Sequence, residues 1–112
     1  MVAAVLGYEG GVGVRSGCFC AHPYVVHLLQ LSEAEKRQWK ERMLAGNKEA
    51  MPGMVRTSFG CYSNTDDVDR LIEMLERTAR GEYEGDYRVN PATGEYLPAD
   101  YEDPVREFFS LE

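Results

Sequence analysis

The strongest alternation of apolar and polar residues in this chain has helical spacing. Between residues 64 and 81 apolar side chains follow one another three or four positions apart, which predicts a helix with one core-facing stripe. Asn64 or Thr65 is expected to cap this helix, and Gly81 to end it. The predicted stripe consists of Val68, Leu71, Ile72, Leu75 and Ala79.

Three more helices are predicted upstream. The first covers the apolar residues 2–6 and stops at a cluster of glycines. The second begins with a proline, covers residues 23–29 and should be mostly buried. The third follows a capping-box pattern, covers residues 32–46 and lies on the surface, where Trp39 and Met43 form one narrow buried stripe.

Strand-like alternation appears at residues 12–15, before a turn at Ser16 and Gly17, and more clearly at residues 54–59. The order of elements predicts an α+β fold, with a short, mostly antiparallel sheet packed with helices. Because two short strands make a poor sheet alone, a partner strand is expected from outside this chain or from another copy.

The last part of the chain differs from the rest. Residues 81–112 show no sustained periodicity and are predicted to form an irregular, Tyr- and Pro-rich arm that packs its aromatic side chains on a neighbouring surface. We therefore divide the chain into a domain at residues 1–80 and a C-terminal extension at residues 81–112.

Charge supports this division. The chain has a net charge of −7, and residues 81–112 account for all of it because they hold nine acidic and two basic side chains. The rest is neutral, so no basic stripe is available for nucleic acid. The sequence contains no apolar run of membrane-spanning length and no basic start of a signal peptide, which predicts a cytoplasmic protein without membrane contact.

Three cysteines, Cys18, Cys20 and Cys61, are an odd number, which argues against a disulfide framework. Cys20 precedes the expected helix start at Pro23, where free amides and the helix dipole favour the nucleophilic thiolate. Burial beneath the loop is the alternative for Cys20, and Cys18 is expected to fill the loop. A metal site is disfavoured because the paired spacing of zinc ligands is absent.

Two motifs carry a family resemblance. Residues 11–23 read GVGVRSGCFCAHP, residues 55–65 read VRTSFGCYSNT, and residues 68–71 read VDRL. In this order and spacing they resemble the C-terminal small domain of class V aminotransferases of the cysteine-desulfurase type, which are pyridoxal-phosphate (PLP) enzymes of fold type I. The chain departs from the family pattern at Ser63, which separates Tyr62 from Asn64, and at Cys18 and Phe19, because desulfurases of this branch often have two histidines before the cysteine.

The resemblance implies roles for four residues. Cys20 matches the catalytic cysteine, which in desulfurases attacks the sulfur of a substrate cysteine, keeps it as a persulfide and releases alanine. Arg56 matches the arginine that binds the substrate carboxylate, and a strand suits that task because it fixes the planar guanidinium. Arg15 is expected either to support the cysteine loop or to form an ordinary structural pairing, and Asn64 is expected to support the site.

The resemblance also implies what lies elsewhere. In the family PLP is bound covalently by a lysine, beside a stacking histidine, in a large upstream domain. The lysines here, Lys36, Lys40 and Lys48, lie on or just past a polar helix, so we expect no cofactor-binding residue in this chain and no activity from it alone.

The expected partners are the large domain of the same enzyme, a second copy in a homodimer of the full-length enzyme, and an amino-acid substrate. Desulfuration, transamination and a lyase reaction all stay open. The alternative is a free-standing small protein that transfers sulfur between thiols or binds a partner through its acidic tail.

Overall fold

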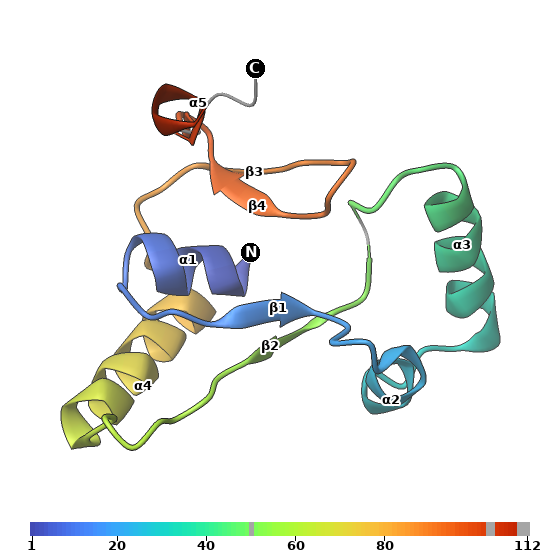
Figure 1. The fold of residues 1–112 in the computed structure, drawn as a ribbon. Coiled ribbons are helices and arrows are strands. Elements are labelled where there is room, and N and C mark those ends of the chain that lie inside the picture. The colour runs from blue at the N-terminus through green and yellow to red at the C-terminus, as the bar shows by residue number, and fades with distance from the viewer. Residues whose placement is uncertain (50, 103–104, 110–112) are drawn as a thin grey trace.

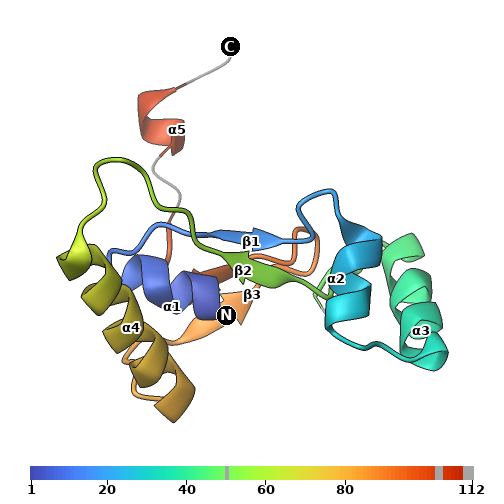
Figure 2. The ribbon, with the colours of Figure 1, turned by 90° about the horizontal axis from the view of Figure 1, so that it is seen from below.

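The computed structural model describes residues 1–49, 51–102 and 105–109 and shows an α+β arrangement (Figure 1). In chain order its elements are α1 (Val2–Tyr8), β1 (Arg15–Gly17), α2 (His22–Leu28), α3 (Glu33–Leu44), β2 (Met54–Arg56), α4 (Thr65–Arg80), β3 (Tyr87–Val89), β4 (Tyr96–Pro98) and α5 (Val105–Phe108). Seen from below, α1 and α4 lie at one end of the β1–β2 ribbon, and α2 and α3 lie at the other (Figure 2). Within the described ranges, no helix has the length and apolar character needed to cross a membrane.

The hydrophobic core lies between α1 and α4. Val5 and Leu6 of α1 pack against Leu71 and Met74 of α4. Gly10 lets the two helices approach closely, because a Cβ atom at this position would lie 2.8 Å from Cγ of Met74. Each fully buried side chain of this size contributes about 1.5–3 kcal/mol to stability, so this small cluster is the main source of hydrophobic stabilisation.

Helix α4 begins and ends where the sequence predicts. The side-chain oxygen of Asn64 accepts hydrogen bonds from the backbone N–H groups of Asp66 and Asp67, at 2.7 and 3.2 Å. The Asp67 carboxylate accepts the N–H of Asn64 in return, which completes a capping box. Gly81 closes the helix in the left-handed conformation, with φ of 73°. These local signals confirm Asn64 as the cap.

The buried face of α4 is narrower than its apolar stripe. Leu71 and Met74 are buried, whereas Ile72 and Leu75 are 48% and 41% exposed. Helix α1 packs on the side of α4 that carries Leu71 and Met74, which leaves the other half of the stripe at the surface. The prediction of a fully buried stripe was therefore wrong for Ile72, Leu75 and Ala79.

Helices α2 and α3 are also less buried than predicted. Val25 is the buried residue of α2, and Leu28 and Leu29 are exposed. Helix α3 starts at the predicted capping box of Ser32, yet it has no buried residue, and Met43 is exposed. These helices project away from the α1–α4 core (Figure 1), so a second layer that would cover them is absent from the described part of the chain.

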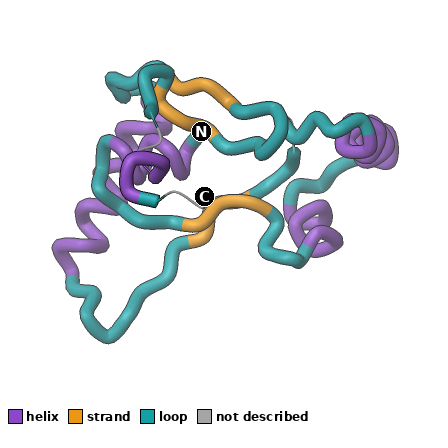
Figure 3. Tube along the Cα trace, turned by 45° about the horizontal axis from the view of Figure 1, so that its top comes forward, coloured by secondary structure: helices purple, strands orange, loops and turns teal. Residues whose placement is uncertain are grey.

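The strands form two separate antiparallel pairs, drawn in orange in Figure 3. Strand β1 starts at Arg15, later than expected, because the glycines before it weaken the strand and Gly11 has a φ of 65°. Its residues Ser16 and Gly17 pair with Val55 and Met54 of β2 and do not form the expected turn. Strand β2 ends at Arg56, earlier than the predicted 54–59, because β1 has no further residue to pair with it.

The chain beyond α4 is folded, which corrects the prediction of an irregular arm. Strands β3 and β4 form a hairpin, and α5 follows it. Tyr83 and Tyr87 pack against the α1–α4 core, so the surface that receives them belongs to the same chain. The parts of the expected arm at residues 103–104 and 110–112 lie outside the described residues.

One carboxylate attaches the tail to α1. Oε1 of Glu9 accepts hydrogen bonds from the N–H of Gly85 and the hydroxyl of Tyr87, both at 2.9 Å, and Oε2 accepts the N–H of Glu84 at 3.1 Å. These bonds, that from Gly85 first, lower the pKa of Glu9. Desolvation and then the bond to Glu9 raise the pKa of Tyr87 to about 12.

We predict that Glu9→Gln loosens the start of the tail. The change removes the charge that these donors share, and charge-assisted bonds contribute about 1.5–3 kcal/mol, so protection of the Gly85 amide in hydrogen exchange should fall at least about tenfold. Because the folded state lowers the pKa of Glu9, its contribution is complete above the unfolded pKa near 4.3 and is lost as pH falls through the folded value.

Protection of the Gly85 amide against hydrogen exchange should therefore decline in acid in the wild-type protein. In Glu9→Gln this decline should be absent, because the variant has no carboxyl group at residue 9 to titrate. Glu82→Gln is the matched control, because Glu82 pairs with Arg80 and, in the described structure, its side chain accepts no hydrogen bond from Glu84 or Gly85. Equal protection in the wild type and both variants would show that Glu9 does not hold the tail.

Candidate functional site

The two sequence motifs meet on the β1–β2 ribbon. Arg15 and Arg56 are direct partners in its register, and directly opposed residues of an antiparallel pair project from the same face. Both are exposed, and no carboxylate in the described ranges forms an ion pair with either. Like charges placed opposite each other destabilise a ribbon. The pair is suited to bind an anion.

A tight turn presents Cys20 just before α2. The N–H of Ala21 donates to the carbonyl of Cys18 at 2.7 Å, so Phe19 and Cys20 occupy the bend. Both have positive φ values, of 52° and 59°, which non-glycine residues seldom adopt. Conformations of this kind cost about 1–3 kcal/mol each and are concentrated at functional sites. The thiol of Cys20 is exposed.

Cys18 is the buried thiol of the loop. It is 6% exposed, and its Sγ donates a hydrogen bond to the carbonyl of Pro52 at 2.9 Å. Burial raises the pKa of Cys18, which disfavours the thiolate. Cys18 is therefore the cysteine that packs beneath the loop, as predicted for it, and the exposed Cys20 does not.

Arg56 links the ribbon to the cysteine turn. Its guanidinium carbon lies 4.8 Å from the centroid of the Phe19 ring, which is the geometry of a cation–π contact. Phe19 immediately precedes Cys20, so the two residues with predicted roles, Arg56 and Cys20, belong to one neighbourhood. The motifs do not indicate a role for Phe19, whose only local signal is its place between Cys18 and Cys20.

Asn64 has a structural role in this arrangement. Its side-chain oxygen is engaged by two backbone amides at the start of α4. The supporting role in the site that the resemblance implies for Asn64 stays a prediction. Cys61 is exposed in the connection between β2 and α4.

Two open hollows of the described surface are not lined by the proposed site residues. One of about 430 Å³ is lined by α2, α3 and their connection, including His27 and Lys36. Another, of about 160 Å³, is lined by α3 residues and Pro52. Neither is lined by Cys20 or Arg56. Among the described residues, no group of three or more His, Cys, Asp or Glu side chains could hold a metal ion.

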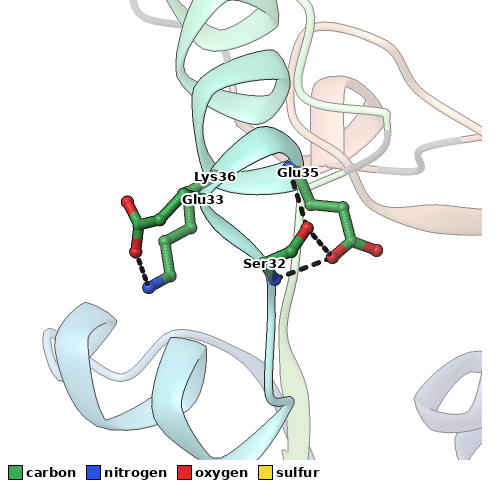
Figure 4. A network of polar contacts seen from close by, with 4 residues as sticks. All are labelled: Ser32, Glu33, Glu35 and Lys36. Atoms are coloured by element: carbon green, nitrogen blue, oxygen red, sulfur yellow. Dashed lines mark hydrogen bonds and ion pairs between the residues drawn. The ribbon is translucent and has the colours of Figure 1, made fainter.

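The lysines of the chain do not fit a PLP site. Lys36 pairs with Glu33 at 2.7 Å in the first turn of α3 (Figure 4), and Lys40 and Lys48 are exposed. A lysine that binds PLP needs an enclosed position beside groups that hold the ring and the phosphate. None of the three lysines has such surroundings in the described structure.

Comparison with known proteins agrees with the motifs. The family model described as aminotransferase class-V matches residues 1–71. A curated relative, molybdenum cofactor sulfurase 2 of Culex quinquefasciatus, is 36% identical over 72 residues. The alignment covers 59% of this chain and 10% of the relative, so the chain spans about a tenth of that protein's length. No solved structure matches the chain.

We predict that the three thiols differ in their rates of alkylation. Cys20 should react fastest because it is exposed at a strained turn before a helix, and Cys18 should react at least about tenfold more slowly because burial protects it and raises its pKa. Site-resolved mass spectrometry after brief treatment with iodoacetamide measures all three rates. In urea the differences should narrow. Equal rates in the folded protein would contradict the prediction.

Proposed function

Because the chain belongs to the class V aminotransferase family, we propose that it is the C-terminal small domain of a larger PLP-dependent enzyme. The domain presents Cys20 and Arg56 to a cofactor that is held by other parts of that enzyme. The observation that carries this proposal is the contact of Arg56 with Phe19, which joins the two motifs at the exposed cysteine. Without the rest of the enzyme the chain is expected to be inactive.

The proposed partners follow from what the chain lacks. A large domain of the same enzyme would supply the lysine, the ring-stacking histidine and the phosphate site, and the full-length enzyme would be a homodimer. The short length of the match relative to the sulfurase supports a place within a longer protein. The exposed half of the α4 stripe, with Ile72 and Leu75, is a surface that additional protein could cover.

Arg56 would bind the α-carboxylate of an amino-acid substrate. A guanidinium group offers two parallel N–H donors, which fix the carboxylate in direction as well as in position. The Phe19 ring restrains the guanidinium from one side. Arg15, opposite on the ribbon, adds positive charge and carries no counter-ion in the described structure, which favours an anionic substrate group at this face.

Cys20 would accept sulfur from the substrate. The overall change is cysteine plus the Cys20 thiol to alanine plus a Cys20 persulfide, in which a sulfur–sulfur bond forms as the substrate carbon–sulfur bond breaks. This change needs no external oxidant or reductant. An exposed cysteine at a turn suits the reaction because the persulfide must then reach an acceptor. The name of the sulfurase relative favours sulfur transfer over transamination.

We predict that Cys20→Ser in the full-length enzyme abolishes persulfide formation from cysteine, because serine cannot form the sulfur–sulfur bond. Mass spectrometry of the peptide that contains residue 20 and assay of released alanine measure the two products. Cys61→Ser is the matched control, since Cys61 is also exposed, and this variant should keep both products. Persulfide on Cys61, with normal alanine release by Cys20→Ser, would refute the assignment.

The isolated chain provides a second control. Incubated with PLP and cysteine, it should form neither persulfide nor alanine, because its lysines do not fit the cofactor. Turnover under these conditions would favour the alternative of a free-standing sulfur-transfer protein.

We further predict that Arg56→Lys in the full-length enzyme raises KM for the amino-acid substrate. Lysine keeps the charge but loses the two-pronged geometry, which is worth about 1–3 kcal/mol, or about fivefold to over a hundredfold in binding. The melting temperature should stay near the wild-type value. Arg37→Lys, on the exposed surface of α3, is the control. Unchanged kinetics, or failure of Arg56→Lys to fold, would make Arg56 a structural residue.

A further inference from the structure

The turn of the β3–β4 hairpin lies against the connection between α3 and β2. The N–H of Lys48 donates to the carbonyl of Pro91 at 2.8 Å. Gly94, on the other side of the same turn, leaves no room for a side chain, because a Cβ atom there would lie 2.8 Å from the Lys48 carbonyl oxygen. Figure 1 shows the hairpin reaching across to this connection.

The same connection contacts the cysteine loop. The N–H of Met51 donates to the Lys48 carbonyl at 3.1 Å, and the next residue, Pro52, accepts the hydrogen bond from Cys18. One position further, a Cβ atom at Gly53 would lie 3.1 Å from the Cα of Gly17. Short contacts therefore lead from the hairpin turn to the residues that begin the Cys18–Ala21 turn.

The opposite end of the hairpin is fixed to the core. Glu9 binds Gly85 and Tyr87 where the hairpin begins, and Tyr87 packs on the α1–α4 cluster. The hairpin thus spans from the core to the connection that supports the cysteine loop. The ribbon and the helices α2 and α3 bury few side chains, so their own packing provides little restraint on this loop.

We propose that the β3–β4 hairpin is a positioning element for the cysteine loop, and that Glu9 and Gly94 are its positioning residues. Glu9 fixes its base, and Gly94 allows its turn to seat on Lys48. The hairpin lies beyond the segment that matches the family, residues 1–71, and so adds to the family's own site. That the loop matters for catalysis rests on the proposed function. The contacts that lead from the hairpin through the α3–β2 connection to the loop do not depend on it.

The decisive comparison is Gly94→Asn against Gly81→Asn. The two glycines have nearly the same φ, 77° and 73°, and asparagine tolerates this conformation better than other residues with a side chain. A Cβ atom at Gly81 meets nothing within 4 Å, whereas at Gly94 it meets the Lys48 backbone. Comparison of the two variants therefore separates the effect of a clash with the Lys48 backbone from the effect of backbone strain at a positive φ.

The readout is the alkylation rate of Cys18 relative to that of Cys61 in the 112-residue chain. Gly94→Asn should raise this ratio about tenfold, because displacement of the connection opens the bond between Cys18 and Pro52. Gly81→Asn should leave it unchanged. Hydrogen exchange at Leu71 and Met74 must stay slow in both variants, which shows that the α1–α4 core is intact.

If Gly94→Asn also exposes the core amides, Glu9→Gln decides the question, because it releases the hairpin at its base and leaves Lys48 untouched. It should raise the same ratio. If Gly94→Asn folds and its Cys18-to-Cys61 alkylation ratio equals that of the wild type, the proposal is overturned. If Gly94→Asn unfolds, a wild-type ratio in Glu9→Gln overturns it. This measurement does not involve PLP or turnover, so its outcome is independent of whether Cys20 accepts sulfur.

Discussion

The packing of α1 on α4 is the interaction on which the rest of the structure depends. Both the ribbon and the tail are attached to this pair of helices. Nε of Arg70 on α4 donates to the Gly10 carbonyl at 3.2 Å, which fixes the chain as it leaves α1 toward β1. Glu9, at the end of α1, receives the tail. A few buried side chains thus define the starting points of the motif-bearing ribbon and of the hairpin that reaches its far end.

The chemically distinctive residues lie where hydrophobic packing is weak. Two opposed arginines, an aromatic ring and an exposed thiol are held by strand pairing, one cation–π contact and one hydrogen bond from a buried cysteine. Such contacts leave polar groups accessible for a ligand, but each is individually small. A site built in this way requires support from neighbouring elements. The β3–β4 hairpin would provide part of this support, and the proposed large domain would provide the rest.

Local rules made part of this structure predictable and part not. The limits of α4 follow from Asn64 and Gly81, whose preferences act over three or four residues. The extent of burial could not be predicted, because the apolar character of Ile72 does not reveal whether another layer covers it. The hairpin was missed because its three-residue strands are too short to show a period. The motifs make Cys20 and Arg56 candidates, whereas their link through Phe19 depends on pairing between distant strands.

The closest contacts of the core also determine the order in which the chain can acquire structure. Arg70 and Gly10 are 60 positions apart, and a helix as short as the seven residues of α1 is not stable in water by itself. During synthesis on the ribosome, α1 must therefore wait for its core partner until α4 has emerged. Closure of so long a loop before any core forms is a slow step, and until the chain has folded Cys18 lacks the burial that shields it in the folded structure.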